Sequence, residues 1–316
     1  IPGLTYESFT AAHKRFYHPS NSYLLLDGSI DQDESFALLD EYLSQFTAID
    51  PATQIAVQQP VCVPRTTVSY PLPAGEDALR RWKLGRGHVI GTYRDAQTLF
   101  AAQVLSDVLC GSNHAPLCRA ILEKGLAEDV SLGCDDQCMQ PVLLLQVQNF
   151  READLPAIQT TLRDTLTSLC ENGLDREQIE ASLASFEFKL RERDYGTMPR
   201  GLIFELEILS SWLYDGDPAA RLHFGEVFEA LHAAVGTGYY EELLRRLLLE
   251  NTHTAEILLR PSQTCGQERQ TRERETLQKT LETLDEAQRS RIVSEQERLA
   301  ALQQEPDSPE ALATIP

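Results

Sequence analysis

Two kinds of hydrophobic pattern alternate along the first 262 positions of the chain. Apolar residues three or four positions apart are typical of helices with one buried face, as at Leu99, Leu105 and Val108. Short apolar runs bounded by turn residues predict strands. The predicted helices are 6–17, 31–46, 95–110, 114–124, 152–171, 175–194 and 199–214, with more helix up to 249; the predicted extended segments are 22–27, 61–70, 82–93, 130–135, 142–148 and 254–259. This interleaving predicts the α+β class, a sheet with helices packed on it.

The pattern changes near Arg260. All 23 aromatic residues lie at or before Tyr240, and the remainder is rich in Glu, Gln, Arg and Leu. Two helices are predicted there, 266–281 and 285–304, each with only a narrow apolar stripe. Such a pair is marginal alone, so we expect it to connect larger parts, with a solvated helical tail as the alternative. We predict an α+β domain over 1–262 and a helical hairpin linker over 263–316.

Charge and cysteine usage narrow the class of partner. The chain has 28 Lys and Arg against 48 Asp and Glu, a formal net charge of −20, which disfavours nucleic acid and anionic membrane surfaces. No apolar run approaches the ~20 residues of a membrane span. Seven cysteines, an odd number, indicate reduced thiols, so we expect the cytoplasm or an organelle matrix. The opening Ile1-Pro2-Gly3, without Met, suggests a piece excised from a longer protein.

Cysteine and histidine spacing gives two weak candidates for a metal site. Cys134 and Cys138 are four apart, which is not the spacing of a zinc knuckle, so two thiols in or near a strand are expected. Cys110, His114 and Cys118 would align on one helix, but a Gly-Ser-Asn turn and a proline interrupt it. We predict no metal ligands in this chain.

Other candidates for catalysis have structural explanations. His13 and His18 are five apart without an intervening Glu, unlike the i, i+4 histidine pair of a helical zinc site; His18 is expected to support the turn before Pro19. Asp31-x-Asp33 is predicted to be a helix cap, because Phe36 occupies the glycine position of a calcium loop. Glu205 and Glu207 could form a catalytic pair, but we expect one to face outward and one to pair with Arg200 or Arg245. No catalytic residue is predicted, and substrate-binding residues are unknown.

Five short blocks, in order, carry a resemblance to a known family. They are Phe16-Tyr17-His18-Pro19-Ser20-Asn21 with Asp27-Gly28-Ser29-Ile30-Asp31; Leu109-Cys110-Gly111-Ser112 with Ala115-Pro116-Leu117 and Ile121-Leu122-Glu123-Lys124-Gly125-Leu126; Gly196-Thr197-Met198-Pro199-Arg200-Gly201-Leu202; Trp212-Leu213-Tyr214-Asp215-Gly216-Asp217-Pro218; and Glu305-Pro306-Asp307-Ser308-Pro309-Glu310-Ala311-Leu312. Together they resemble zinc metallopeptidases of the insulinase or pitrilysin superfamily, in the branch of presequence proteases and falcilysin. Cys110, Asn113-His114 and Ala127 depart from the family pattern.

The resemblance implies an architecture of two halves, each of two related α+β domains, joined by a helical hairpin around a peptide chamber. Its HxxEH zinc motif and distal Glu lie in the first domain, and an Arg/Tyr pair lies in the last. This chain is similar to the second domain plus the hairpin, with 191–262 particular to the presequence-protease branch. It lacks HxxEH, so the zinc would be bound outside it.

The expected function is therefore the chamber wall and hinge, inactive by itself, of a zinc metalloendopeptidase that degrades short unfolded peptides. The expected partners are the remaining peptidase domains of the same polypeptide and peptide substrates. One alternative is a catalytically inactive relative that serves as a scaffold or assembly subunit. A second is an unrelated acidic helical binding protein, which a structure without a central sheet would favour.

Overall fold

The computed structural model describes residues 3–73, 75–193 and 196–313, and its strands form one mixed sheet in the order β1-β5-β2-β4-β3. The strands are β1 (Cys62–Pro71), β2 (Trp82–Val89), β3 (Asp129–Asp135), β4 (Val142–Phe150) and β5 (Thr254–Ser262). β2 pairs antiparallel with β4 and β5, and β3 pairs antiparallel with β4. β1 runs parallel to β5, because Thr254 N–H donates to the Val61 carbonyl near one end and Leu72 N–H to the Ser262 carbonyl near the other. The predicted α+β class is confirmed.

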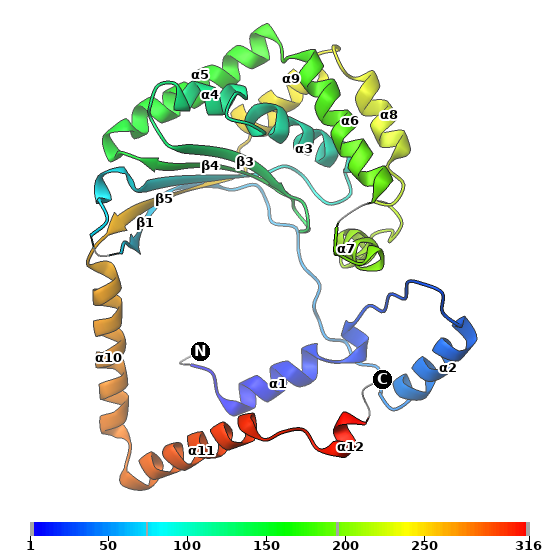
Figure 1. Ribbon diagram of the computed structural model, residues 1–316, viewed down its shortest axis with the longest axis vertical. Coiled ribbons are helices and arrows are strands. Elements are labelled where there is room, and N and C mark those ends of the chain that lie inside the picture. The colour runs from blue at the N-terminus through cyan, green and yellow to red at the C-terminus, as the bar shows by residue number, and fades with distance from the viewer. Residues whose placement is uncertain (1–2, 74, 194–195, 314–316) are drawn as a thin grey trace. The chain divides into compact units, whose positions relative to one another are not determined.

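Helices cover one face of this sheet (Figure 1). The helices that follow the first strands are α3 (Ala96–Cys110), α4 (Pro116–Leu122), α5 (Leu155–Asn172), α6 (Arg176–Glu192), α7 (Arg200–Trp212), α8 (Gly225–Ala233), α9 (Tyr239–Leu244) and the π-helical turn η4 (Arg245–Leu249); short 3-10 turns are η1 (Pro19–Asn21), η2 (Ala78–Arg80) and η3 (Glu152–Asp154). α3 contacts β3, α4, α6, α8 and α9, so it is the centre of the helical layer.

Local sequence explains why α3 holds that position. Asp95 begins the helix by accepting a 2.9 Å hydrogen bond from the Thr98 N–H, which satisfies one of the free amides at its start. Most residues of α3 are buried, including the predicted inward positions Leu99, Leu105 and Leu109. Strand β4 contributes alternate buried residues to the same core, as the period-two geometry of a strand requires.

The chain folds into two compact units, Ile1–Val68 with Leu79–Arg260, and Ser69–Ala78 with Pro261–Pro316. The second unit contains α10 (Cys265–Thr283), α11 (Glu286–Gln304) and α12 (Pro309–Leu312). The two long helices occur where the sequence predicts them. They meet as an open hairpin in Figure 1, and none of their residues is buried.

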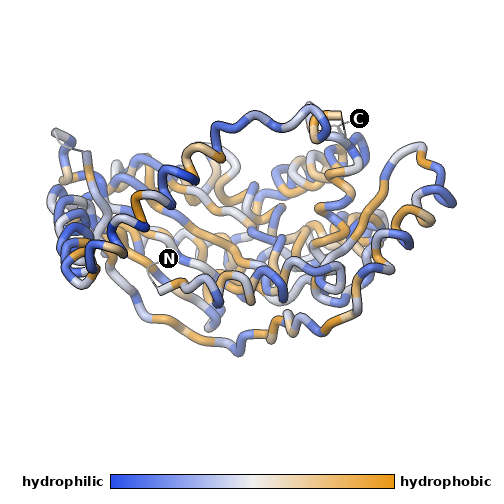
Figure 2. The backbone as a smooth tube through the Cα atoms, turned by 90° about the horizontal axis from the view of Figure 1, so that it is seen from below, coloured by the Kyte–Doolittle hydropathy of each residue, from blue (hydrophilic) through white to orange (hydrophobic). Residues whose placement is uncertain are grey.

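Apolar stretches are short along the described backbone, and polar residues interrupt them throughout (Figure 2). Within residues 3–73, 75–193 and 196–313, no helix has both the length and the apolar character needed to cross a membrane.

Two predicted elements differ from the structure. The strand predicted over 22–27 is wrong: the backbone there has no strand partner among the described residues, and a strand is not stable without one. The helix predicted over 114–124 is shorter, since α4 begins at Pro116, whose fixed φ suits the first helical turn. The predicted closing glycine, Gly125, has φ +62° and donates its N–H to the Leu122 carbonyl. Position 194, the predicted end of the 175–194 helix, and Ile1-Pro2 lie outside the described residues.

Candidate functional site

The N-terminal segment, residues 3–61, is the most unusual surface in the chain. It contains no buried residue. Half of the large exposed apolar side chains of the described residues lie in it: Leu4, Tyr6, Phe9, Phe16, Tyr17, Tyr23, Leu24, Leu26, Ile30, Phe36, Leu38, Tyr42, Phe46, Ile49, Ile55, Val57 and Val61. An apolar surface of this extent is typical of an interface, because water solvates such side chains poorly.

The secondary structure of the N-terminal segment is nevertheless well specified by its sequence. Helix α1 (Tyr6–Phe16) begins with a capping box in which Thr5 and Ser8 each bond the other's backbone N–H. Helix α2 (Gln32–Leu43) begins at Asp31, whose carboxylate accepts from the Glu34 N–H at 3.0 Å. The cap explains the Asp31-x-Asp33 pattern. Because both helices are capped and neither has a buried residue, their apolar faces lack a partner in the described chain.

Few contacts connect the N-terminal segment with the sheet and its helices. The Tyr23 ring lies 4.5 Å from the Trp212 ring, centroid to centroid, in an edge arrangement. Gln58 and Gln140 exchange two hydrogen bonds of 2.7 and 3.0 Å. These polar and aromatic contacts leave most of the apolar side chains of the segment uncovered.

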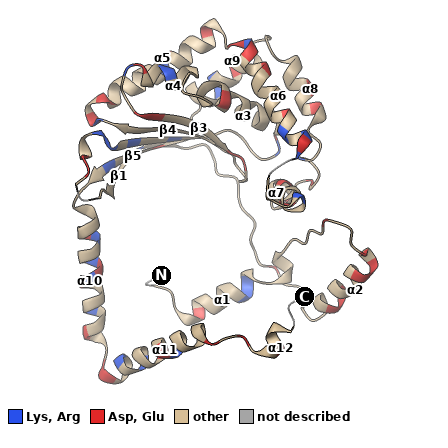
Figure 3. Cartoon of the chain, viewed as in Figure 1, with Lys and Arg blue, Asp and Glu red and all other residues tan. Residues whose placement is uncertain are grey.

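Acidic residues gather on part of this surface. Helix α2 has Asp33, Glu34, Asp40 and Glu41 and no Lys or Arg (Figure 3). The segment therefore combines apolar side chains with a local negative charge, in keeping with the net charge of −20.

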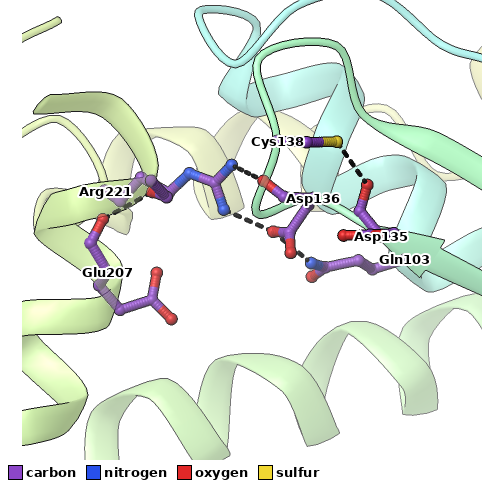
Figure 4. A network of polar contacts seen from close by, with 7 residues as sticks. Gln103, Asp135, Asp136, Cys138, Glu207 and Arg221 are labelled. Atoms are coloured by element: carbon purple, nitrogen blue, oxygen red, sulfur yellow. Dashed lines mark hydrogen bonds and ion pairs between the residues drawn. The ribbon is translucent and has the colours of Figure 1, made fainter. Parts of the chain in front are cut away.

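A buried ion pair fixes the connection that follows α7 (Figure 4). Arg221 is 7% exposed, and its two Nη atoms donate to Oδ2 of Asp136 at 2.5 Å and to the Asp136 carbonyl at 2.9 Å. Gln103 of α3 donates to the same carboxylate oxygen at 3.0 Å. The network joins the β3–β4 connection, α3 and the post-α7 loop. Sequence reasoning missed it, since Arg221 and Asp136 are 85 positions apart and no local pattern relates them.

Glu207 of α7 lies close to this pair. Burial raises the pKa of its carboxyl group; Arg221 opposes the rise and Asp136 adds to it. The predicted pairing of a glutamate here with Arg200 or Arg245 is wrong, because Arg245 lies 3.8 Å from Glu242 and the cation that acts on Glu207 is Arg221.

Glu205, the other half of the candidate catalytic pair, faces different surroundings. It borders a hollow that Asp27, Arg193 and Leu202 also line, whereas Glu207 is influenced by Arg221 and Asp136. The two carboxylates therefore do not act on one space, as a catalytic pair would have to.

A tight turn closes α7 within one of the motifs singled out in the sequence. The Tyr93 hydroxyl donates to the Tyr214 carbonyl at 2.7 Å, and Ser211 Oγ donates to the Asp217 carbonyl at 2.7 Å. At Gly216 a Cβ atom would lie 2.7 Å from the Tyr93 ring, so only glycine fits this close approach. The motif is explained by this packing.

The cysteines and histidines considered as metal ligands do not assemble into a site. Cys110 ends α3 and Cys118 lies in α4, with the predicted break between them. Cys134 lies in β3, where burial raises the pKa of its thiol to about 12, and burial also raises the pKa of Cys138. Thiols held protonated in this way are poor metal ligands and poor nucleophiles.

The two N-terminal histidines have structural contacts. His13 stacks on Tyr17 with centroids 4.8 Å apart, and His18 Nδ1 accepts from the Ser20 N–H at 3.1 Å, capping the turn η1. In the part of the chain that the structure describes, no three His, Cys, Asp or Glu side chains come together as a possible metal site. The donor set of a zinc centre is thus not present in these residues.

Solved structures of M16 peptidase-like proteins share this fold. A protease from Helicobacter pylori superposes with a TM-score of 0.60 at 13% sequence identity, covering 82% of this chain and 60% of that one. A peptidase M16 inactive domain from Pseudomonas fluorescens superposes with a TM-score of 0.59 at 15% identity, covering 83% of this chain and 58% of that one. The α+β fold with its helices on one face is therefore the fold of M16-like peptidase domains.

Sequence comparison shows the family. Residues 3–186 match the family model described as peptidase M16 inactive domain, and residues 259–316 match a second model, described as associated with subgroup C of the M16 peptidases. The chain belongs to the peptidase M16 family, and the resemblance to the insulinase or pitrilysin superfamily is confirmed. It is a non-catalytic portion of a peptidase-like protein by this assignment.

The relatives with the same segment are much longer than this chain. Protein HypA of Clostridium perfringens is 33% identical over the whole chain, which covers 33% of HypA. Presequence protease 1, chloroplastic/mitochondrial, of Arabidopsis thaliana is 31% identical over the whole chain, which covers 30% of that protein. This chain spans about a third of the length of these relatives.

Proposed function

We propose that this chain forms the chamber wall and hinge of a presequence-protease-like zinc metalloendopeptidase that degrades short unfolded peptides. The observation that carries the proposal is the N-terminal segment, whose apolar side chains are exposed on two capped helices and on the extended residues between them. Their partners would be the remaining peptidase domains of the same polypeptide, which in the relatives amount to about two-thirds of the length.

The extended residues 22–27 supply a specific contact within that interface. Tyr23, Leu24 and Leu26 are exposed, although the run has the composition of a buried strand. Pairing with a strand of another domain would satisfy the backbone N–H and carbonyl groups of this run and cover both of its faces. We therefore assign residues 22–27 to a sheet completed outside this chain.

The zinc ion belongs, in this proposal, to those other domains. The support is chemical: a structural or catalytic zinc site uses three or four close His, Cys or carboxylate donors, and no such group occurs among the residues described. The contribution of this chain to peptide hydrolysis is to enclose the substrate and to position the domains that perform the reaction.

The division of labour within the chain follows the predicted boundary. Residues 1–262 would form the wall, with 191–262 particular to the presequence-protease branch, and 263–316 the linker. α10 and α11 have no buried residue and meet in an open turn at Leu284 and Asp285, which suits a segment that changes angle as a chamber opens and closes. The cytoplasm or an organelle matrix is the proposed compartment; the Arabidopsis thaliana relative is named chloroplastic/mitochondrial.

The proposal is tested on the intact polypeptide that contains this chain and on the 316-residue chain alone. The intact protein should bind stoichiometric zinc by elemental analysis and cleave an unfolded peptide, whereas the 316-residue chain should do neither. If the intact protein binds no zinc and cleaves nothing, the chain belongs instead to an inactive scaffold of the same family.

A surface variant tests the role of the N-terminal segment. Leu24→Asp with Leu26→Asp should lower peptidase activity of the intact protein by about tenfold or more, because two carboxylates would enter the domain interface. The matched control is Phe188→Asp on α6, a side chain that is 64% exposed outside the segment, and it should retain activity. Equal activity of the two variants would contradict the proposed interface.

A further inference from the structure

A cavity of about 140 Å³ lies between the helix-covered face of the sheet and α5. Most of its wall is leucine, contributed by β2, β4, α4, α5 and η4. Its polar lining consists of Arg86, His88, Gln159, Arg163 and Glu256. The cavity is therefore amphipathic, with apolar walls and a small set of convergent polar groups, which is the usual composition of a small-molecule site.

The cationic groups of this cavity outnumber its anionic group. Glu256 is already engaged: its carboxylate oxygen accepts from Arg65 Nε at 2.5 Å and from Gln159 at 3.4 Å. Arg86 lies directly opposite Glu256 in the β2–β5 register, but neither Arg86 nor Arg163 has an ion pair or hydrogen bond with another described residue. Two guanidinium groups thus border an apolar space without an anion of the described chain to neutralise them.

His88 adds a buried polar atom without a partner. Its side chain is 2% exposed, and its Nδ1 makes no hydrogen bond with any described residue. Burial, together with the charge of Arg86, lowers its pKa to about 4, so the ring is neutral near pH 7. An unpaired nitrogen buried among leucines is costly, and a ligand with a polar end would offset that cost.

The π-helical turn η4 shapes the same cavity. Leu248 and Leu249 of η4 line it. A π-turn places one extra residue in a helical turn, and such turns occur mostly at functional sites. This local irregularity of the helix coincides with the cavity and with no other feature of the core described above.

We propose that this cavity binds a small aliphatic carboxylate, with the carboxylate at Arg86 and Arg163 and the alkyl group against the leucines. A guanidinium fork matches the two oxygens of a carboxylate. A dry apolar cavity of roughly 150 Å³ holds a molecule the size of benzene, so about four to six carbons fit. The leucine wall disfavours a strongly hydrated dianion such as phosphate.

The carboxylate has two chemical sources, a free short-chain acid or the C-terminal residue of a peptide. Isovalerate represents the first. A pentapeptide that ends in leucine represents the second, and the same peptide with a C-terminal amide is its control. The site and its test do not depend on the proposed peptidase function, since binding is measured without zinc or hydrolysis.

Isothermal titration calorimetry with the full 316-residue chain tests the proposal, with the histidine ring NMR signals as a second readout. Isovalerate or the free-acid pentapeptide should bind and shift the signals of His88. Arg163→Met, at the exposed mouth, should weaken binding by about tenfold or more without unfolding the chain, and Arg86→Met should act in the same direction.

Arg151→Met is the matched control, because Arg151 is exposed and does not line the cavity; it should bind as the wild type does. Binding of isovalerate alone identifies a free acid, and binding of the pentapeptide but not its amide identifies a peptide C-terminus. The proposal is overturned if neither probe binds, or if binding survives Arg163→Met and Arg86→Met unchanged.

Discussion

His88 illustrates, at the scale of a residue, how a strand position decides the chemistry of a side chain. It lies on the same face of β2 as Leu84 and Arg86, and that face points toward the helices. The period-two pattern of the sequence already placed Arg86 and His88 at inward positions of a predicted strand. The sequence analysis did not use this signal, although two polar residues at core positions are the kind of departure that marks a site.

The burial of His88 predicts a pH dependence of stability. Its pKa is about 4 in the folded chain against 6.5 for the unperturbed ring, so the unfolded chain binds the proton more readily between these values. The free energy of unfolding should be highest above pH ~6.5 and fall by up to ~3 kcal/mol on acidification to about pH 4. Denaturant unfolding at a series of pH values measures the change.

His88→Gln should remove most of this slope between pH 6.5 and about 4, since glutamine does not titrate. The matched control, His114→Gln, replaces an exposed histidine and should keep it. The comparison of variants is needed because Glu187, whose pKa is lowered by its bond to Arg191, also loses stabilisation in acid. A wild-type slope in His88→Gln would show that the ring is accessible to protons in the fold.

At the scale of elements, the sequence predicted what local patterns determine. Helices α3, α5 and α10 follow from periodicity and caps within one stretch of chain. The strand expected over 22–27 failed because a strand also needs a partner, which the pattern of one segment does not contain. The Arg221–Asp136 pair was missed for the same physical reason: its energy comes from residues that only the fold brings together.

That pair predicts how α7 and its following loop are held. Arg221→Met should lower the free energy of unfolding by about 3 kcal/mol, because Asp136 would keep a largely buried charge without its cation. Its matched control is Arg176→Met on α6, where an exposed i, i+4 pair with Glu180 should contribute under about 0.5 kcal/mol. Urea titrations of both variants measure the difference.

A double-mutant cycle with Asp136→Asn separates the ion pair from the packing of the arginine stem. Since the neutral amide removes the stranded charge, the double variant should be more stable than the sum of the two single changes predicts. Additive losses would assign the stabilisation to packing of the Arg221 side chain and contradict the ion-pair explanation.

At the scale of the whole molecule, the net charge of −20 bears on which peptides a chamber with this wall attracts. Acidic residues also gather on α2 (Figure 3). A negative wall raises the local concentration of basic peptides, and salt screens the effect over a Debye length of about 10 Å at 0.1 M. The net charge was readable from composition, but its placement on particular elements required the fold.

The intact polypeptide should therefore bind a Lys- and Arg-rich unfolded peptide several-fold more weakly as the ionic strength rises from about 0.05 to 0.3 M. A neutral peptide of the same length should bind with little change. Fluorescence anisotropy with the two labelled peptides measures both affinities, and parallel salt curves for the two would argue against electrostatic selection by the wall.

The unequal burial of the seven cysteines has a practical consequence. Cys62, at the start of the edge strand β1, is exposed, whereas burial raises the pKa of Cys110, Cys118 and Cys134. Maleimide dyes react with accessible thiols that ionise near neutral pH. Cys62 thus offers a native attachment point for a fluorophore, from which distance changes within the assembled protein can be followed without engineering a new thiol.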